Sequence, residues 1–313
     1  MKIKTAVVGV GHMGKEHARI YSLLENSELV GVYDIDSDVA RRVAQQYNKK
    51  HFSSLDDLIE TAEAVTIATP TESHLDVASR CIRKGKHVLV EKPLANDTQE
   101  AMRLVHMAEE AQVILQVGHI ERFNPVLQAL EERLTHPRFI EAHRLSPYPG
   151  RSTDIGVVLD LMIHDLEIIL HLVKSPIQSI DAVGIPVLSK GEDIANARIR
   201  FENGCVANLT TSRISPEKMR KIRVFQEDAY LSLDYQNQSG EIYRKIRSQI
   251  TREAIPVIKE EPLRRQLESF LECVGTRTAP VVSGIHASQA LRVAVQILEE
   301  IAKNPSMPFL EPV

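Results

Sequence analysis

The sequence predicts an α/β protein, in which an N-terminal doubly wound parallel sheet precedes an α+β domain with a mainly antiparallel sheet. Up to about residue 120, short apolar runs rich in β-branched residues alternate with amphipathic helical patterns. Beyond that point, strand-like segments follow one another through short turns. We therefore expect two domains, 1–122 and 123–313, in a chain long enough for each to have its own core.

The N-terminal half alternates strands with helices. Continuous apolar runs are typical of strands that are buried on both faces, and their alternation with helices predicts a parallel sheet. The expected strands are 5–10, 29–33, 64–68, 87–90 and 113–117, and the expected helices are 15–24, 38–47, 73–83 and 98–111.

The second half has a different rhythm, typical of an antiparallel sheet with flanking helices. Glu202-Asn203-Gly204 indicates a hairpin turn between two of its strands. The expected strands are 139–145, 177–187, 194–201, 205–211, 221–226 and 229–233, and the expected helices are 124–133, 157–173, 262–274 and 287–302. Residues 235–258 show the least regular pattern.

Composition limits the classes of function. Of 313 residues, 43% are hydrophobic and 26% charged, as in ordinary soluble globular proteins. A net charge of -4 gives no electrostatic reason to expect nucleic acid or an anionic membrane as a partner. The sequence contains three cysteines, far apart and without a C-x-x-C pair, which argues against a disulfide framework. With no secretory signal and no apolar stretch of about 18 residues, we expect a cytoplasmic protein.

A glycine-rich motif, Gly9-Val10-Gly11-His12-Met13-Gly14, lies between the first predicted strand and the first predicted helix. Gly9 permits the tight turn, Gly11 lets the backbone approach a pyrophosphate, and Gly14 allows close helix–strand packing. The free N–H groups at the helix N-terminus suit phosphate oxygens. The motif in this context predicts a dinucleotide-binding Rossmann unit, in preference to a glycine turn without a ligand.

The acid at the end of the second predicted strand indicates which dinucleotide is bound. Asp34 stands twenty residues after Gly14, where a carboxylate accepts hydrogen bonds from the adenosine ribose hydroxyls. A 2′-phosphate would face its negative charge, and the neighbouring Ile35 and Asp36 offer no arginine to offset it. We therefore expect NAD, with NADP as the less favoured alternative.

Polar side chains follow two more predicted strands, at the sheet edge where such folds bind ligands. Thr69, Pro70 and His74 lie in the first of these segments, and Glu91-Lys92-Pro93 forms the second. Position alone leaves Lys92 open as a reacting group or as an ordinary surface lysine.

Asp160 and His164 interrupt an apolar helical stretch at a spacing of four. This spacing puts them on one helical face, where a catalytic pair and a satisfied core pair are both possible. We do not expect a metal site, because two ligands without a third are too few.

Together these motifs resemble the Gfo/Idh/MocA family of sugar-type oxidoreductases. Glu261-Pro262-Leu263 and the Pro-x-Val-x-Gly pattern at 280–284 also match family segments, so the resemblance covers almost the whole chain in order. Met162 stands where the family commonly has glycine, and Glu167, or alternatively Asp165, stands where it often has aspartate.

The resemblance implies roles for the candidate residues. His164 would be the catalytic acid/base, Lys92 would hydrogen-bond the reacting hydroxyl, and Asp160 would bind a neighbouring hydroxyl or orient the site. Glu91 would help to orient the nicotinamide ribose. The remaining expected cofactor contacts are His12, Met13, Thr69, Pro70, His74 and Lys92 itself. The resemblance also implies that the Lys92–Pro93 peptide bond is cis.

The substrate is less well specified by the sequence. We expect Arg122, Arg144, Tyr148 and Arg151 to contribute to the substrate site together with Asp160 and His164, because guanidinium groups bind phosphate oxygens bidentately. The alternative for Arg144 and Arg151 is a structural or exposed position.

The resemblance implies NAD-dependent oxidation of a secondary hydroxyl, with the 3-hydroxyl of a UDP-N-acetylhexosamine as the favoured site. The product would be a 3-keto sugar on the route to the 3-amino sugars of lipid A. The alternatives are a dehydrogenase of a free sugar or of a cyclitol such as inositol, and a non-catalytic NAD-binding regulator. The family commonly pairs its antiparallel sheets between subunits, which implies a homodimer or homotetramer.

Overall fold

The computed structural model describes residues 2–148 and 155–303, which form two compact units. The first comprises 2–123 and 260–289, and the second comprises 124–148, 155–259 and 290–303. A single boundary near residue 122 therefore does not describe the division, because residues 260–289 return to the first unit. The sequence pattern gives no sign of this return, since a helix carries the same apolar periodicity whichever core it joins.

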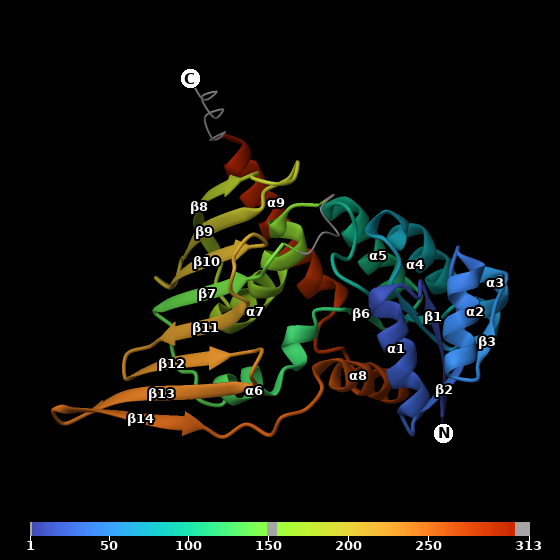
Figure 1. The fold of residues 1–313 in the computed structure, drawn as a ribbon, viewed down its shortest axis with the longest axis horizontal. Coiled ribbons are helices and arrows are strands. Elements are labelled where there is room, and N and C mark those ends of the chain that lie inside the picture. Colours follow the sequence, from blue (N-terminus) through green and yellow to red (C-terminus); the bar gives the residue numbers. More distant parts are fainter. Residues whose placement is uncertain (1, 149–154, 304–313) are drawn as a thin grey trace. The chain divides into compact units, whose positions relative to one another are not determined.

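The first unit contains a six-stranded parallel sheet in the order β3-β2-β1-β4-β5-β6 (Figure 1). This order, with reversal beside β1, is that of a dinucleotide-binding Rossmann sheet, as predicted. Its strands are β1 (Ile3–Val8), β2 (Ser27–Tyr33), β3 (Lys50–His51), β4 (Ala64–Ile67), β5 (His87–Val90) and β6 (Leu115–Val117). The short β3 and the helix α3 that follows it are additions to the predicted set.

The helices of the first unit begin where the sequence supplies caps. Asp36 accepts hydrogen bonds from the Asp38 and Val39 amides at the start of α2, and Asp97 caps α5 in the same way through Glu100. Apolar residues of α1, α2 and α8 share one core with β1 and β2. The helices are α1 (His12–Leu23), α2 (Ser37–Gln46), α3 (Leu55–Thr61), η1 (Thr71–Ser73), α4 (His74–Arg83), α5 (Thr98–Glu110), η2 (Ile120–Phe123) and α8 (Pro262–Thr276).

The second unit contains an eight-stranded sheet in the order β14-β13-β12-β11-β7-β10-β9-β8. Every pair of neighbouring strands in this sheet is antiparallel except the pair β7–β10, which is parallel. The strands are β7 (Phe139–Leu145), β8 (Ile177–Ile185), β9 (Ile194–Phe201), β10 (Val206–Ser212), β11 (Met219–Phe225), β12 (Ala229–Asp234), β13 (Ser239–Ile246) and β14 (Gln249–Ile255).

The hairpin β13–β14 corrects the irregular reading of 235–258. β14 is the edge strand of the sheet, and nearly all of its side chains are exposed or half-buried. It therefore has no need of the alternating apolar pattern by which strands are recognised. The predicted turn at 202–204 is confirmed, with Gly204 at a φ of 84° between β9 and β10.

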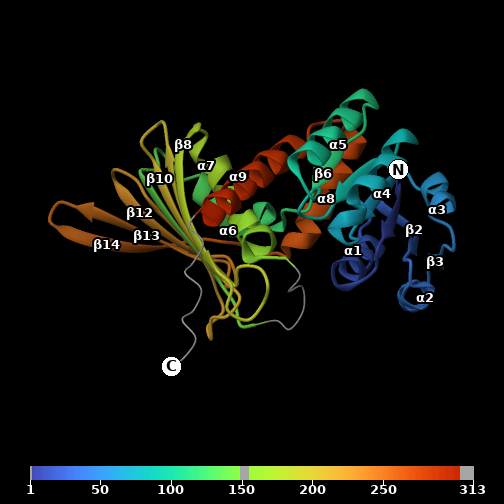
Figure 2. The same cartoon turned by 90° about the horizontal axis from the view of Figure 1, so that it is seen from above.

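Helices α6 (Pro125–Glu131) and α7 (Ile163–Val173) cover one face of this sheet, and the residues of α9 (Gly284–Lys303) from Ala290 onward belong to the same unit (Figure 2). The expected single helix over 157–173 is wrong in its first part. Residues Val158–Met162 form a π-helical turn, η3, in which the Ile163 amide bonds to the Val158 carbonyl. Among the described residues, no helix combines the length and the apolar character that crossing a membrane requires.

Candidate active site

The glycine motif has the geometry of a nucleotide cradle. Gly9 has a φ of 80°, and a Cβ on Gly14 would lie 1.8 Å from the Gly9 carbonyl oxygen, so neither position accepts a side chain. A Cβ on Gly11 would meet nothing within 4 Å, which leaves open space above the loop. No side chain caps the first turn of α1, where His12 and Met13 lie, and no acidic residue occurs in it. The backbone N–H groups of this turn are therefore available to donate hydrogen bonds to the pyrophosphate of a bound dinucleotide.

Asp34 is fixed at the end of β2, beside this loop. Its two carboxylate oxygens accept hydrogen bonds from the Val10 amide at 2.8 Å and the Asp36 amide at 3.0 Å. Ile35 is 93% exposed, and Arg41 pairs with Asp38 at 2.9 Å. The Asp34 carboxylate is thus held in place by backbone amides, and no arginine among the described residues is shown bonded to it. An uncompensated carboxylate at this position suits a ribose with free hydroxyls.

The second polar segment is organised around His74, which is 1% exposed. Its Nδ1 and Nε2 each lie 2.9 Å from a carbonyl oxygen, that of Pro93 and that of Thr69 respectively. Burial lowers the pKa of His74, against the raising effect of these two carbonyls. The Ser73 hydroxyl donates to the Thr69 hydroxyl and to the Pro70 carbonyl. His74 therefore ties the segment after β4 to the segment after β5.

The Glu91-Lys92-Pro93 segment follows β5, and its Lys92–Pro93 peptide bond is cis, as the resemblance implied. Glu91 is 8% exposed, and its Oε1 lies 2.8 Å from Nε2 of His17, a residue of α1 with no exposed surface. His17 is not among the residues predicted from the sequence. The available signal was its spacing from Gly14, Ala18 and Tyr21, which places it on the buried face of α1.

The environment of Lys92 includes further basic groups. His119 is 1% exposed, and burial, followed by the positive charges of Lys92 and Arg122, lowers its pKa to about 3. His119 is therefore neutral at working pH. Arg122 lies in η2 and is half-buried. Lys92 and Arg122 thus place two positive charges close to one neutral imidazole in the first unit.

In the second unit, Asp160 lies in the π-turn and His164 in the first turn of α7, both half-buried. The prediction that the two side chains share one face assumed a regular α-helix. Asp160 and His164 instead lie on either side of a change from π-helix to α-helix. A π-turn is rare and occurs frequently at functional sites. The pair therefore sits on an irregular helix that the surrounding chain must hold in place.

Glu192 anchors the start of this irregular helix. Its Oε1 accepts the Val158 amide at 3.0 Å, and its carbonyl accepts the Val157 amide at 3.0 Å. A Cβ on Gly156 would lie 2.0 Å from the same carboxylate, so only glycine leaves room for this contact. Asp193, next to Glu192, accepts from the amides of 187–189.

The predicted substrate arginines have different outcomes. Arg144 is 4% exposed, and its Nε and Nη2 both contact the Asp165 carboxylate at 2.9 Å. The guanidinium is thus directed at a buried acid of α7, which agrees with the structural position that the sequence left open for Arg144. Tyr148 is 40% exposed, and Arg151 lies outside the described residues. Glu167, the other acid considered in this helix, is 2% exposed.

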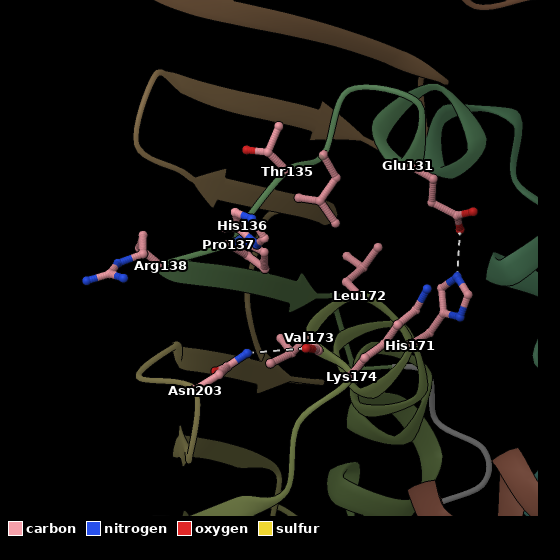
Figure 3. Close-up of a pocket in the computed structure, with 11 residues that line it drawn as sticks. Glu131, Thr135, His136, Pro137, Arg138, His171, Leu172, Val173, Lys174 and Asn203 are labelled. Atoms are coloured by element: carbon pink, nitrogen blue, oxygen red, sulfur yellow. Dashed lines mark hydrogen bonds and ion pairs between the residues drawn. The ribbon is translucent and has the colours of Figure 1, made fainter.

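A pocket of about 590 Å³ in the second unit lies at the C-terminal ends of α6 and α7 (Figure 3). Figure 3 shows His171 directed at Glu131 and Asn203 directed at the Val173 carbonyl. The distance between His171 Nε2 and Glu131 Oε1 is 3.1 Å. Basic side chains at helix C-termini are ordinary partners of the helix dipole. None of the candidate catalytic or cofactor residues lines this pocket, and we assign it no role in the reaction.

Both halves of the chain match family models of known proteins. A family model described as "Oxidoreductase family, NAD-binding Rossmann fold" matches residues 3–119, and one described as "GFO/IDH/MocA C-terminal domain" matches residues 130–232. UDP-N-acetylglucosamine 3-dehydrogenase of Acidithiobacillus ferrooxidans is 36% identical over 94% of this chain and 96% of its own length. Its solved structure matches with a TM-score of 0.93, covering 97% of this chain and 99% of that chain.

A second relative acts on a cyclitol. The scyllo-inositol 2-dehydrogenase (NAD(+)) of Bacillus subtilis strain 168 is 27% identical over 94% of this chain and 92% of its own length. The family models, the identity over nearly the full length and the NAD-fitting cradle lead to one conclusion: the chain belongs to the Gfo/Idh/MocA family and is an NAD-binding oxidoreductase.

Proposed function

We propose that the protein oxidises the 3-hydroxyl of a UDP-N-acetylhexosamine to a 3-keto sugar, with NAD as the cofactor. The observation that carries this proposal is the 36% identity to a UDP-N-acetylglucosamine 3-dehydrogenase across nearly the whole of both chains. The inositol dehydrogenase relative of comparable coverage is only 27% identical. The product would be ready for transamination to a 3-amino sugar, a step toward lipid A.

Each candidate residue has a proposed role in this reaction. NAD, when bound, supplies the hydride acceptor. We propose that His164 takes the proton of the reacting hydroxyl, because the pKa of a histidine ordinarily lies near working pH. The ammonium of Lys92 stabilises the developing alkoxide, and Asp160 holds a neighbouring hydroxyl or orients His164. Arg122 and Tyr148 are proposed substrate contacts, whereas Arg151 is proposed on its sequence position alone.

The residues of the first unit favour NAD over NADP for this task. The fixed Asp34 carboxylate and the adjacent Asp36 would repel a 2′-phosphate. The nearby Arg41 is engaged by Asp38. Thr69, Pro70 and Glu91 complete the proposed cofactor contacts, with His74 holding their two segments together.

Two other functions remain as candidates. A dehydrogenase of a free sugar or a cyclitol is favoured by the inositol dehydrogenases among the relatives. A non-catalytic NAD-binding regulator is disfavoured, because the chain retains Lys92, Asp160 and His164 together.

A substrate panel tests the proposal. NADH absorbance is followed with NAD and, separately, UDP-N-acetylglucosamine, UDP-N-acetylgalactosamine, UDP-glucose, glucose, glucose 6-phosphate and myo-inositol. We expect turnover with a UDP-N-acetylhexosamine and a product whose carbonyl carbon is C3 by NMR. Turnover restricted to inositol or a free sugar would establish the alternative dehydrogenase, and NADH binding without any turnover would favour the regulator.

We also propose a homodimer or homotetramer formed through the sheet of the second unit. Phe139, Phe225, Tyr230 and Tyr243 form a ladder across four neighbouring strands, with ring centroids 5.6, 4.6 and 5.1 Å apart. Their sequence neighbours Ile140, Val224, Leu231 and Ile242 belong to the core, so the ladder lies on the opposite face, away from that core. An aromatic face of this kind suits a subunit contact. A monomer by light scattering at micromolar concentration would contradict it.

A cytoplasmic location stays part of the proposal. It is supported by the three cysteines, which are all free and buried.

A further inference from the structure

We propose that His17 is a positioning residue, which acts on the reaction by fixing the carboxylate of Glu91 next to Lys92. The inference rests on the proposed function, in which Glu91 contacts the nicotinamide ribose and Lys92 the reacting hydroxyl. His17, a residue of α1, is fully buried and is not proposed to contact the ribose or the hydroxyl itself.

The contact joins two segments that are 74 residues apart in the sequence. His17 Nε2 lies 2.8 Å from Glu91 Oε1, with the His17 side chain fully buried and that of Glu91 11% exposed. The tautomer with its proton on Nε2 donates to this oxygen. A carboxylate in such a site is costly unless it is hydrogen-bonded, so the His17 donor stabilises the charge where it stands.

Two further contacts restrict the same carboxylate. Its Oε2 accepts the Lys92 amide at 3.3 Å, so the Glu91 side chain is tied to the backbone of the next residue. On another side, a Cβ on Gly118 would lie 2.7 Å from both carboxylate oxygens. Gly118 thus provides the space for the carboxylate, His17 provides the donor, and the Lys92 backbone provides the connection to the reacting side chain.

His17 also links the cofactor cradle to the hydroxyl-binding segment. It lies one turn into α1, whose N-terminus carries the glycine motif, and it bonds to the segment after β5. A second buried contact from the same helix joins Tyr21 to Thr66 of β4 at 2.8 Å. Both contacts hold α1 to the sheet, but only the His17 contact reaches a residue proposed to bind the cofactor.

A double-mutant cycle tests whether His17 acts through Glu91. His17→Leu removes the donor, Glu91→Gln removes the carboxylate charge, and both are combined. We measure the NADH dissociation constant by fluorescence, kcat and KM with NAD and the best UDP-N-acetylhexosamine, and Tm for each variant. His17→Gln, whose amide can still donate to Glu91, is the rescue variant. Tyr21→Phe is the control, because it removes the other buried polar contact of α1.

We expect His17→Leu to lower kcat by about tenfold and to weaken NADH binding by about the same factor, as for a buried acceptor that loses its donor. His17→Gln should recover most of the loss, and Tyr21→Phe should stay within about twofold of wild type. In the Glu91→Gln background, His17→Leu should change neither constant further.

Additive effects in the cycle would overturn the proposal, as would a His17→Leu protein within twofold of wild type in both constants. The NADH arm needs no sugar substrate. Absence of turnover by the wild-type protein would therefore count against the proposed function, while the binding cycle would still decide the role of His17.

Discussion

At the scale of single residues, the proposed chemistry depends on Lys92 and His164. Replacing either with alanine removes a charge-stabilising or proton-accepting group, and we expect kcat to fall by about 10² or more. The NADH dissociation constant of His164→Ala should change little, because His164 is proposed to act on the sugar. Steady-state kinetics and fluorescence titration measure both quantities. Near-normal kcat in both variants would show that the residues are wrongly assigned.

Asp34 provides the second test at this scale. Asp34→Ser removes the carboxylate that would repel a 2′-phosphate and keeps a small polar side chain at the position. We expect the ratio of kcat/KM for NAD to that for NADP to fall by about tenfold or more, since one close charge–charge repulsion disappears. A wild-type enzyme that already prefers NADP would contradict the role given to Asp34.

Residue types and local spacing were sufficient to propose cofactor residues, because each belongs to one short motif. Contacts between distant segments were not predictable in this way. His17 and Glu91 are far apart in the sequence, and nothing local connects them. The pairing of Arg144 with Asp165 was not predictable either, because the two residues lie on different elements and sequence alone does not pair one acid with one base across 21 residues.

At the scale of elements, the irregular helix that carries Asp160 and His164 depends on the contact between Gly156 and Glu192. We expect Gly156→Ala to displace the Glu192 carboxylate from the Val158 amide and to cost about 1 kcal/mol of unfolding free energy, as for a lost helix cap. kcat should fall while NADH affinity is retained. Chemical denaturation and steady-state kinetics measure these effects.

Gly275→Ala is the matched control, because a Cβ at this helical glycine of α8 meets nothing within 4 Å. It should be neutral or slightly stabilising. If Gly156→Ala behaves like Gly275→Ala, the Glu192 contact does not support the helix.

Most elements were predictable because buried elements carry a periodic apolar pattern. Three of the exceptions have a clear physical reason. β14 is an edge strand with little burial, so it lacks that pattern. The π-turn needs one extra residue inside a helical turn, which leaves the apolar composition of 157–173 unchanged. β3 has only two residues and therefore offers no period to detect.

At the scale of the whole molecule, buried histidines of the first unit make folding stability depend on pH. Burial, followed by the charges of Lys92 and Arg122, lowers the pKa of His119 to about 3, and burial with the charge of Arg277 lowers the pKa of His87 to about 4. Both values lie below the unfolded value of about 6.5. The unfolded state therefore binds protons first as the pH falls, and the stability present above pH 6.5 is progressively lost below it.

We expect the free energy of unfolding to decrease when the pH is lowered from 7.5 to 5.0. Below pH 6.5, each of the two histidines should contribute a loss of roughly 1 kcal/mol for every pH unit. Denaturant titrations at the two pH values measure it. His87→Asn tests one contributor, since the asparagine oxygen can still accept the Ile114 amide but does not titrate. It should lose less stability on acidification than wild type, and an equal loss would remove His87 from the explanation.

Transfer of hydrogen from C3 of the sugar to the nicotinamide is the central claim for the whole enzyme, and isotope labelling tests it most directly. The protein is incubated with NAD and UDP-N-acetylglucosamine deuterated at C3, and separately with the same sugar deuterated at C4, and the NADH is analysed by mass spectrometry. We predict deuterated NADH from the C3-labelled sugar alone. Deuterium transfer from C4, or unlabelled NADH formed from the C3-labelled sugar, would contradict oxidation at the 3-hydroxyl.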